Sequence, residues 1–304
     1  MNKLMVLCLL VPWLALAQEK TNSTDAQAAA LVKQMKTLKE LEAKLHFETG
    51  TVTLKKDLAK ITMPEEFRYL SGADADTVLE KMWGNPPGAH TLGMIVPAKG
   101  SLLSAEAWAV IITYDEDGYV KDADADKINY TDLLKKMQES TRESNKEREK
   151  EGYPGIELVG WAAPPRYEKE THKMYWAKEI RFSDSKENTL NYNIRILGRR
   201  GVLVLNAVAS MKDFAVIQEQ SPAIVKMVDF KEGHRYADFD GKTDKVAAYG
   251  LAALVAGGIA AKAGLFKLLW VGILAAKKFI IIGAVAAWGF IKKLVKGKKD
   301  PHEI

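Results

Sequence analysis

Apolar residues along this chain follow two local patterns, and each pattern predicts one kind of element. From residue 25 to residue 45 they recur at steps of three and four, with Lys and Glu between them, which predicts an amphipathic helix. The same pattern over residues 130–149 predicts a second long helix, whose polar last turns are expected to be exposed to water. Two shorter helices are predicted, one over residues 74–83 with Asp74 or Asp76 as its N-cap and one over residues 214–228.

Short runs of apolar and β-branched residues predict the strands. Four such runs follow one another, and the short turns between them are typical of an antiparallel meander. They cover residues 155–163, 173–183, 189–197 and 202–210. Further strands are predicted over residues 59–63, 91–97 and 107–114, and a hairpin or strand pair is predicted over residues 46–54. Because strands outnumber helices and do not alternate with them, we expect an α+β fold with a mainly antiparallel sheet and flanking helices.

The first residues of the chain predict a secretory signal peptide. Residues 1–17 have one Lys near the start, an apolar core, and the small residues Ala15 and Ala17 at the positions that a signal peptidase reads. The apolar core is too short to span about 30 Å of hydrocarbon. Export would leave Gln18 as the new N-terminus and would place the chain in the periplasm of a Gram-negative bacterium.

Residues 246–299 are far more apolar than the rest of the chain and predict a membrane anchor. Lysines divide this run into short pieces, and a Lys at the bilayer centre costs about 2.5–3.5 kcal/mol. We therefore expect a C-terminal transmembrane helical hairpin with helices over roughly 244–261 and 265–296. The lysines expected to flank the membrane on its cytoplasmic side are Lys292, Lys293 and Lys296. An exported N-terminus with a cytoplasmic end requires an odd number of crossings, so the number of crossings stays open.

Three glycines of the predicted anchor, Gly250, Gly257 and Gly264, lie seven residues apart. Small residues at this spacing let helix backbones approach closely. We expect these glycines to pack the two helices of the hairpin against each other. The alternative is a glycine-striped membrane multimer, in which the same residues form the seam of a homo-oligomer.

The charge of the chain is divided unequally between its parts. The net charge is +5, yet residues 18–245 hold 34 Lys and Arg against 37 Asp and Glu, while residues 246–304 hold 9 against 2. The positive excess therefore belongs to the anchor, where lysines meet lipid headgroups, and no nucleic-acid partner is expected. The single cysteine, Cys8, lies in the signal peptide, which excludes disulfides and thiol catalysis in the mature chain.

The densest group of carboxylates lies between Asp115 and Asp126. Aspartates two residues apart, at Asp122, Asp124 and Asp126, are candidate ligands for a hard cation such as Ca²⁺. An EF-hand loop beginning at Asp122 would need Gly and Glu at positions where this chain has neither. A solvated turn before a helix N-terminus explains the cluster without a metal. A metal-dependent hydrolase that uses this loop is therefore the alternative to a protein without catalysis.

Other sequence features that would support catalysis are absent. The histidines are widely separated, no serine lies in a Gly-x-Ser-x-Gly turn, and there is no glycine-rich phosphate-binding motif. We therefore assign no catalytic residue and no cofactor. The segment from Trp161 to Tyr167, with Pro164 and Pro165, is where we would first look for a groove, because prolines and aromatic residues at a sheet edge form a stiff apolar surface.

Three distinctive motifs lie in the mature chain. Residues 82–86 read MWGNP, residues 114–122 read YDEDGYVKD, and residues 236–250 contain YADF followed by TDKVAAYG. With these motifs the chain resembles a bacterial family of membrane-anchored proteins catalogued as a domain of unknown function. The resemblance implies a membrane location and brings no catalytic residues with it.

Together these features predict an exported binding or scaffold protein of the cell envelope. It would lie at the inner membrane with its soluble domain facing the periplasm, and its partners would be the lipid bilayer and a protein of the envelope. The predicted parts are a signal peptide at 1–17, an amphipathic helix at 18–45, an α+β domain at 46–230, a connector at 231–245 and an anchor at 246–299.

Overall fold

The computed structural model describes residues 29–257, except residues 56, 86, 105–106 and 151. The chain divides into two compact units, the second of which is Leu45–Ile282. The described part of the first unit is a helix over residues 29–42, which confirms the predicted N-terminal helix. All other described elements belong to the second unit, the sheet domain.

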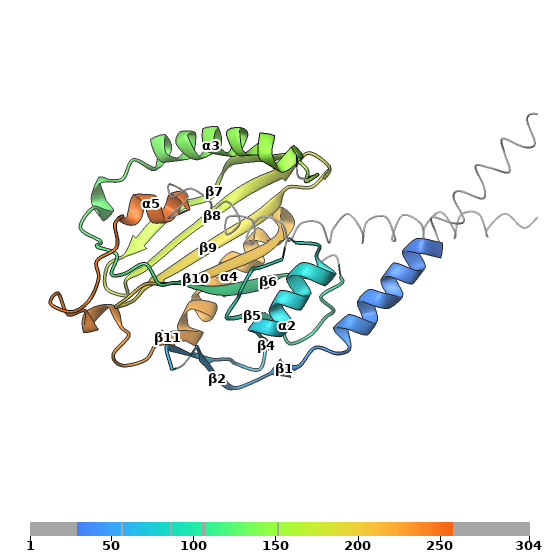
Figure 1. Cartoon of the computed structure of the whole chain (residues 1–304), viewed down its shortest axis with the longest axis horizontal. Coiled ribbons are helices and arrows are strands. Elements are labelled where there is room, and N and C mark those ends of the chain that lie inside the picture. The colour runs from blue at the N-terminus through green and yellow to red at the C-terminus, as the bar shows by residue number, and fades with distance from the viewer. Residues whose placement is uncertain (1–28, 56, 86, 105–106, 151, 258–304) are drawn as a thin grey trace, which may run out of the picture. The chain divides into compact units, whose positions relative to one another are not determined.

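The sheet domain is built on an eight-stranded sheet in which every neighbouring pair is antiparallel. Four consecutive strands, β7 to β10, form the predicted meander (Figure 1). In spatial order the strands are β1 (Phe47–Glu48), β4 (Phe67–Ser71), β5 (Gly93–Pro97), β6 (Ala109–Asp115), β10 (Val202–Ser210), β9 (Thr189–Leu197), β8 (Lys173–Phe182) and β7 (Ile156–Glu168). The expectation of an α+β fold with a large antiparallel sheet is confirmed.

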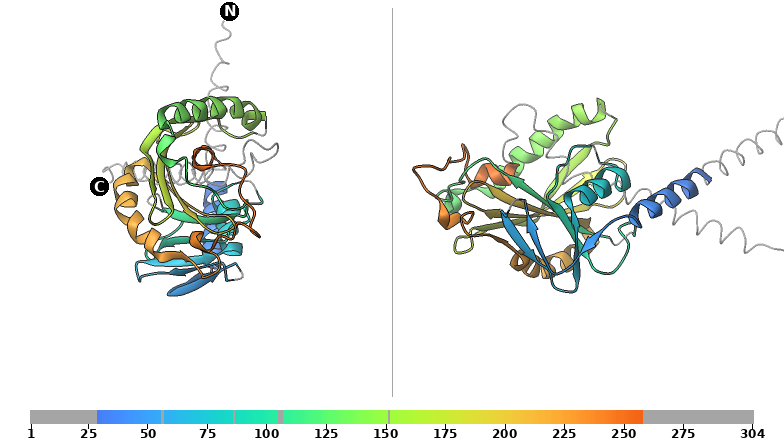
Figure 2. Two further views of the ribbon diagram at one scale, coloured as in Figure 1. Left: turned by 90° about the vertical axis from the view of Figure 1, so that its left-hand side faces the viewer. Right: turned by 60° about the horizontal axis from the view of Figure 1, so that its bottom comes forward.

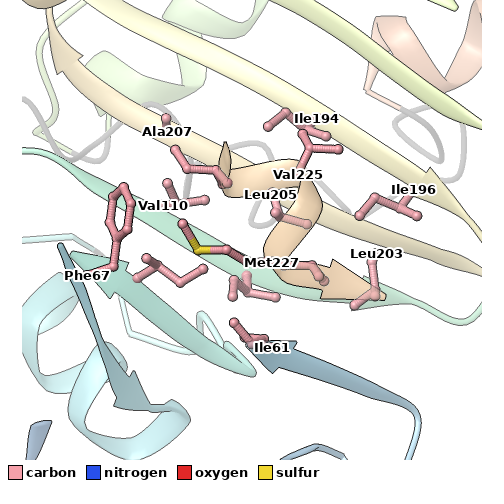
Figure 3. Close-up of a cluster of buried hydrophobic side chains, with 14 of the residues drawn as sticks. Ile61, Phe67, Val110, Ile194, Ile196, Leu203, Leu205, Ala207, Val225 and Met227 are labelled. Carbon is pink, nitrogen blue, oxygen red and sulfur yellow. The ribbon is translucent and has the colours of Figure 1, made fainter. Parts of the chain in front are cut away.

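One face of this sheet is covered by helix α4 (Phe214–Met227) and a three-stranded sheet. The small sheet has the order β11 (Val228–Phe230), β3 (Ala59–Thr62) and β2 (Thr51–Leu54). Alternate residues of the central strands point to this side and pack on the helix and on Ile61, as Figure 3 shows. The labelled members of this core are Ile61, Phe67, Val110, Ile194, Ile196, Leu203, Leu205, Ala207, Val225 and Met227.

The opposite face is covered by helices α3 (Tyr130–Lys150) and α5 (Leu251–Ala256). Figure 2 shows α4 on one side of the sheet and α3 with α5 on the other. Trp176 and Val204 of the sheet share a second apolar cluster with Leu251 and Leu254 of α5. The remaining helical elements are α2 (Gly72–Thr77), the π-helix η1 (Val78–Met82) and the short 3₁₀ turns η2 (Ala125–Lys127), η3 (Met211–Asp213) and η4 (Tyr236–Asp238).

Two local predictions near the N-terminus are wrong. The hairpin over 46–54 does not form, because β1 pairs with β4 in the large sheet whereas β2 pairs with β3 in the small one. Gly50, with φ of 75°, lies between the two strands where the chain passes from one sheet to the other. The N-cap of α2 is Ser71, not Asp74 or Asp76, and both carboxylates are used elsewhere: Asp74 accepts from the amide of His46 and Asp76 from that of Thr91.

The first helix predicted for the anchor, over 244–261, forms only in part within the residues described. Val246 forms a bridge with Tyr119, and helix begins only at Leu251. Gly257 has φ of 113° and ends α5 in the left-handed conformation. Within the described residues there is no helix of the length and apolar character that a membrane crossing requires. The second predicted helix and the three flanking lysines lie outside the described residues.

Candidate functional site

Two of the sequence motifs meet at one corner of the sheet domain. The amide of Tyr119 donates to the carbonyl of Lys245 at 2.8 Å, and the amide of Ala247 donates to the carbonyl of Tyr119 at 2.9 Å. Gly118 makes this approach possible, since it has φ of 113° and a Cβ there would lie 2.6 Å from the carbonyl of Lys245. We call this region, residues 115–124 with 167–172, 199–200 and 236–251, the C-terminal corner.

A buried ion pair also stabilises the C-terminal corner. The carboxylate of Asp244, only 1% exposed, accepts from Nε of Arg199 at 2.6 Å and from Nε of Arg200 at 2.9 Å. It also accepts from the amide of Asp240 at 2.8 Å. The hydrogen bond from Arg199 holds the pKa of Asp244 well below its usual range. This carboxylate therefore stays ionised and ties the segment before α5 to the turn between β9 and β10.

The acidic loop supplies hydrogen-bond acceptors to the same segment and to β7. Asp117 accepts from the hydroxyl of Tyr249 at 3.1 Å, and Asp122 accepts from the hydroxyl of Tyr167 at 2.7 Å. Asp124 accepts from the amide of Leu251 at 3.4 Å, where the first turn of α5 leaves its amides without partners inside the helix. These three carboxylates therefore accept hydrogen bonds from other parts of the protein.

The three aspartates predicted as metal ligands do not all lie in the C-terminal corner. Asp122 and Asp124 lie in the C-terminal corner, whereas Asp126 lies in η2. Over the described part of the chain, no three His, Cys, Asp or Glu side chains are grouped so as to hold a metal ion.

Three rings are stacked beside the acidic loop, and a fourth ring lies against them at a tilt. The ring centroid of Tyr119 lies 3.9 Å from that of Phe239 and 4.3 Å from that of Tyr236, and the ring centroid of His172 lies 4.0 Å from that of Tyr236. Two rings cannot share one face of Tyr119 at these distances, so its ring is held between the other two. Stacking of this kind adds about 0.5–1.5 kcal/mol per pair to the burial of the rings.

Asp122, Tyr167 and His172 form a connected polar group at the end of the stack. The hydroxyl of Tyr167 is 3.3 Å from Nδ1 of His172, which lies 3.7 Å from the carboxylate of Asp122. Because the Tyr167 hydroxyl donates to Asp122, its oxygen can only accept in the contact with His172, which fits the tautomer that carries N–H at Nδ1. Burial, followed by the hydrogen bond to Asp122, raises the pKa of Tyr167, so this phenol stays protonated at neutral pH. The group joins the β7–β8 turn to the acidic loop.

Two of the three glycines expected to pack membrane helices lie at the two ends of α5. Gly250 and Gly257 are the N-cap and C-cap of α5, so both flank the helix. A Cβ on Gly250 would lie 2.6 Å from a carboxylate oxygen of Asp124, which explains the glycine by contact with the acidic loop. Gly264 lies outside the described residues.

The MWGNP motif lies away from the corner, and of the proposed groove segment only Tyr167 belongs to it. Trp83 of the MWGNP motif is fully buried and donates from Nε1 to the carbonyl of Leu102 at 3.2 Å, so it belongs to the packing around η1. The segment with Pro164 and Pro165 is the second half of β7, where the pairing with β8 shifts register on both sides of Ala163. Trp161, on the same strand, is partly buried on the α3 side of the sheet.

Sequence patterns indicate the acidic loop but not the contacts that fix the corner. Arg199 and Arg200 lie in no motif, and Asp244 lies in the motif TDKVAAYG without any sign of its two partners. The two motifs that meet in the corner, YDEDGYVKD and TDKVAAYG, are both visible in the sequence. They are more than 100 residues apart and share no local pattern, so the sequence does not show that they are in contact.

Comparisons with known proteins give a family. The solved structures that resemble the chain include cyanobacterial PsbP from Synechocystis sp. PCC 6803, with 12% identity, a TM-score of 0.34, and coverage of 61% of this chain and 92% of that one. They also include LpqN of Mycobacterium tuberculosis, involved in cell envelope biogenesis, with 11% identity, a TM-score of 0.31, and coverage of 62% and 94%. A search of curated proteins finds no significant match. A family profile matches residues 46–289, and the chain therefore belongs to the family described as protein of unknown function (DUF2167).

Proposed function

We propose that this protein is an exported binding or scaffold protein of the cell envelope, without catalytic activity at its acidic loop, held at the inner membrane by residues that follow Gly257. The observation that carries the proposal is the C-terminal corner. It builds residues 236–256 into the sheet domain, so that the chain passes from a packed core directly into the apolar segment expected to be the tether.

The contacts of the corner support a fixed attachment. Leu251, Leu254 and Val255 are each at most 2% exposed, and they pack with the sheet residues of the second apolar cluster. The ion pair of Asp244 with Arg199 and Arg200 precedes this helix and is itself buried at the carboxylate. These contacts tie the chain to the sheet domain as far as α5, the last described element before the expected tether.

The use of the acidic carboxylates supports binding over hydrolysis. A metal-dependent hydrolase needs carboxylates that are free to hold a cation or to move a proton. Asp117, Asp122 and Asp124 instead accept hydrogen bonds from Tyr249, Tyr167 and Leu251. Three carboxylates of the loop thus have a structural use.

The location is tested with the full-length protein in a Gram-negative host. We expect it to stay with the inner membrane after a carbonate wash, and we expect protease added to spheroplasts to digest the sheet domain. A protein released by the wash, or a domain protected in intact spheroplasts, would contradict the proposed location. A variant without residues 1–17 serves as the control for export.

The binding role is tested by cross-linking in living cells followed by identification of the products. We expect one recurrent hetero-complex that forms with the wild type and decreases in the Asp244→Asn variant, whose corner is loosened. A product with twice the mass of the chain would indicate the homo-oligomer instead. Absence of any product dependent on the folded domain would remove the binding role.

A further inference from the structure

Polar side chains occupy the centre of the sheet on the face covered by α3 and α5, where the surrounding residues are apolar. They come from the three neighbouring strands β8, β9 and β10. We call them the central polar strip: Lys178, Asn191, Asn193, Arg195 and Asn206, with the indole N–H of Trp176.

The strand register places these side chains side by side. Lys178 pairs with Asn191 and Trp176 pairs with Asn193 across β8 and β9. Asn193 in turn pairs with Asn206 of β10. Side chains that are directly opposite in an antiparallel pair lie on the same face with Cβ atoms about 4.5–5.5 Å apart. Trp176 packs in the apolar cluster of α5, so the whole strip faces that side of the sheet.

The acceptors of the strip are already used inside it. Arg195 donates from Nη1 to Oδ1 of Asn206 at 3.1 Å and from Nη2 to Oδ1 of Asn193 at 3.4 Å. Its guanidinium carbon also lies 4.9 Å from the ring centroid of Trp176. Asn193 donates from Nδ2 to Oδ1 of Asn191 at 2.8 Å. These bonds hold the carboxamides and the guanidinium in one orientation.

Two donors of the strip have no partner among the described residues. The indole N–H of Trp176, a residue only 1% exposed, makes no hydrogen bond there. Lys178 is 9% exposed, and no described group accepts a hydrogen bond from its ammonium or forms an ion pair with it. The Lys178 ammonium is not among the fully buried atoms without a partner, so its nitrogen keeps some contact with solvent. The buried indole N–H without a partner costs about 1–3 kcal/mol. Such a cost is expected where the groups serve a ligand.

The charges of the strip leave one positive charge unmatched. Arg195 lies close enough to Asp115 of β6 for the carboxylate to favour its charged form. Asp115 pairs with Val202 across β6 and β10, so its side chain faces the same side as the strip. The charge of Lys178 has no such counterpart, and the positive charge of Arg195 acts against it. A ligand with a single negative charge would therefore balance the strip.

We propose that the central polar strip is the binding site of a carboxylate, one of whose oxygens accepts from Lys178 and the other from the indole N–H of Trp176. A planar monoanion with two acceptor atoms matches two donors on adjacent positions of one strand face and one unmatched charge. Trp161 pairs with Lys178 across β7 and β8 and is partly buried on the same face, so its ring would contact the apolar part of the molecule that bears the carboxylate.

This site gives the ligand class for the binding function proposed above, and it does not depend on the membrane tether. The test uses the full-length protein in non-ionic detergent. Its probes are acetate, butyrate and inorganic phosphate, added up to about 10 mM, a range that detects millimolar dissociation constants. The readouts are titration calorimetry and the ¹⁵N–¹H signal of the Trp176 indole, assigned from its loss in Trp176→Phe.

We expect butyrate and acetate to bind and to shift the Trp176 signal, with butyrate the tighter of the two if Trp161 contacts the apolar part. Equal affinities for butyrate and acetate would contradict the contact with Trp161, although they would agree with a carboxylate site at Lys178 and Trp176. Lys178→Met should weaken carboxylate binding at least tenfold, whereas Lys186→Met, which changes an exposed lysine on the next turn, should leave it unchanged.

Three results would overturn the proposal. These are no saturable carboxylate binding, unchanged affinity in a folded Lys178→Met variant, and tighter binding of phosphate than of either carboxylate. Since Lys178→Met removes a buried charge, its folding is not at risk. Failure of this test would leave the envelope location and the cross-linked partner untouched, so the two proposals can fail separately.

Discussion

Arg199 and Asp244 are 45 residues apart in the sequence, yet Nε of Arg199 lies 2.6 Å from a carboxylate oxygen whose side chain is only 1% exposed. Arg200 donates to the other oxygen of the same carboxylate. The pair joins the β9–β10 turn to the segment that leads into α5. One buried carboxylate thus contributes to the attachment of the C-terminal segment, beside the backbone bonds of Tyr119 and the packing of α5.

Asp244→Asn should loosen this segment. The neutral amide cannot accept from both guanidinium groups as the carboxylate does, so the two arginines would be left without a charge partner. We expect a melting temperature several degrees lower and faster proteolysis within residues 231–257. Asp184→Asn, on the exposed turn between β8 and β9, is the matched control. Equal resistance of the two variants to proteolysis would contradict this role for Asp244.

The contribution of this pair should depend on pH in the acid range. The folded protein holds the pKa of Asp244 below its ordinary value, so the unfolded chain binds the proton first on acidification. The stability from the pair is fully present above the ordinary carboxyl pKa of about 3.9 and is lost as the pH falls through the lower folded value. The difference in melting temperature between wild type and Asp244→Asn should therefore narrow below about pH 4. A difference that stays constant with pH would contradict the pKa shift.

Gly118→Ala should disrupt the contact between the acidic loop and the C-terminal segment. The new Cβ would lie 2.6 Å from the carbonyl of Lys245, and φ of 113° is unfavourable for alanine. We expect a loss of about 2 kcal/mol or more in the free energy of unfolding, measured by urea denaturation. Gly160→Ala is the control, because no heavy atom lies within 4 Å of a Cβ built there. Equal losses in the two variants would show that the close approach is not required.

Lys178→Met should stabilise the protein at neutral pH. Burial, with the nearby charge of Arg195 as a smaller cause, lowers the pKa of Lys178 to about 8. Below that pH both the folded and the unfolded chain carry the proton, and the buried charge costs about 3 kcal/mol. Between about pH 8 and 10 the folded protein releases the proton first, so the cost declines. The advantage of the methionine variant in urea denaturation should therefore shrink across this range, and a variant less stable than wild type at pH 7 would contradict the assignment.

Divalent cations should not stabilise the acidic loop. One carboxylate oxygen of Asp122 already accepts from the hydroxyl of Tyr167, and one of Asp124 accepts from the amide of Leu251. Among the described residues no three His, Cys, Asp or Glu side chains are grouped so as to hold a metal ion. We expect the melting temperature to be the same with either cation and with a chelator. A cation-dependent rise that disappears in the Asp122→Asn variant would restore the metal-dependent hydrolase as the better interpretation.

The sequence predicted the parts of the fold that depend on local patterns. The strands β7 to β10 and the helix α3 follow from periodicity within each segment, and consecutive strands joined by short turns pair with each other. The hairpin over 46–54 failed because β1 finds its partner in β4, where Phe47 pairs with Leu70. Such a choice depends on which strand edge is free in the folded sheet, and no local pattern records it.

The candidate sites could be predicted only in part. The acidic loop was visible from its aspartates, but their acceptor roles depend on Tyr167, Tyr249 and Leu251, which are up to 132 residues away in sequence. The central polar strip was not visible at all. Lys178, Asn191 and Asn206 each look like an ordinary polar residue in a strand, and only their register makes them neighbours.

By itself, then, the sequence determined the antiparallel α+β class, the long helices, the uneven distribution of charge and the motifs of the family, because composition and periodicity are properties of short segments. Tertiary structure decided the rest. It packed Ala247 and the α5 residues Leu251, Leu254 and Val255 onto the sheet, placed acceptors of the acidic loop beside this segment, and aligned five polar side chains on three strands. These outcomes come from burial and from pairing between distant segments, whose free energy exists only in the folded chain.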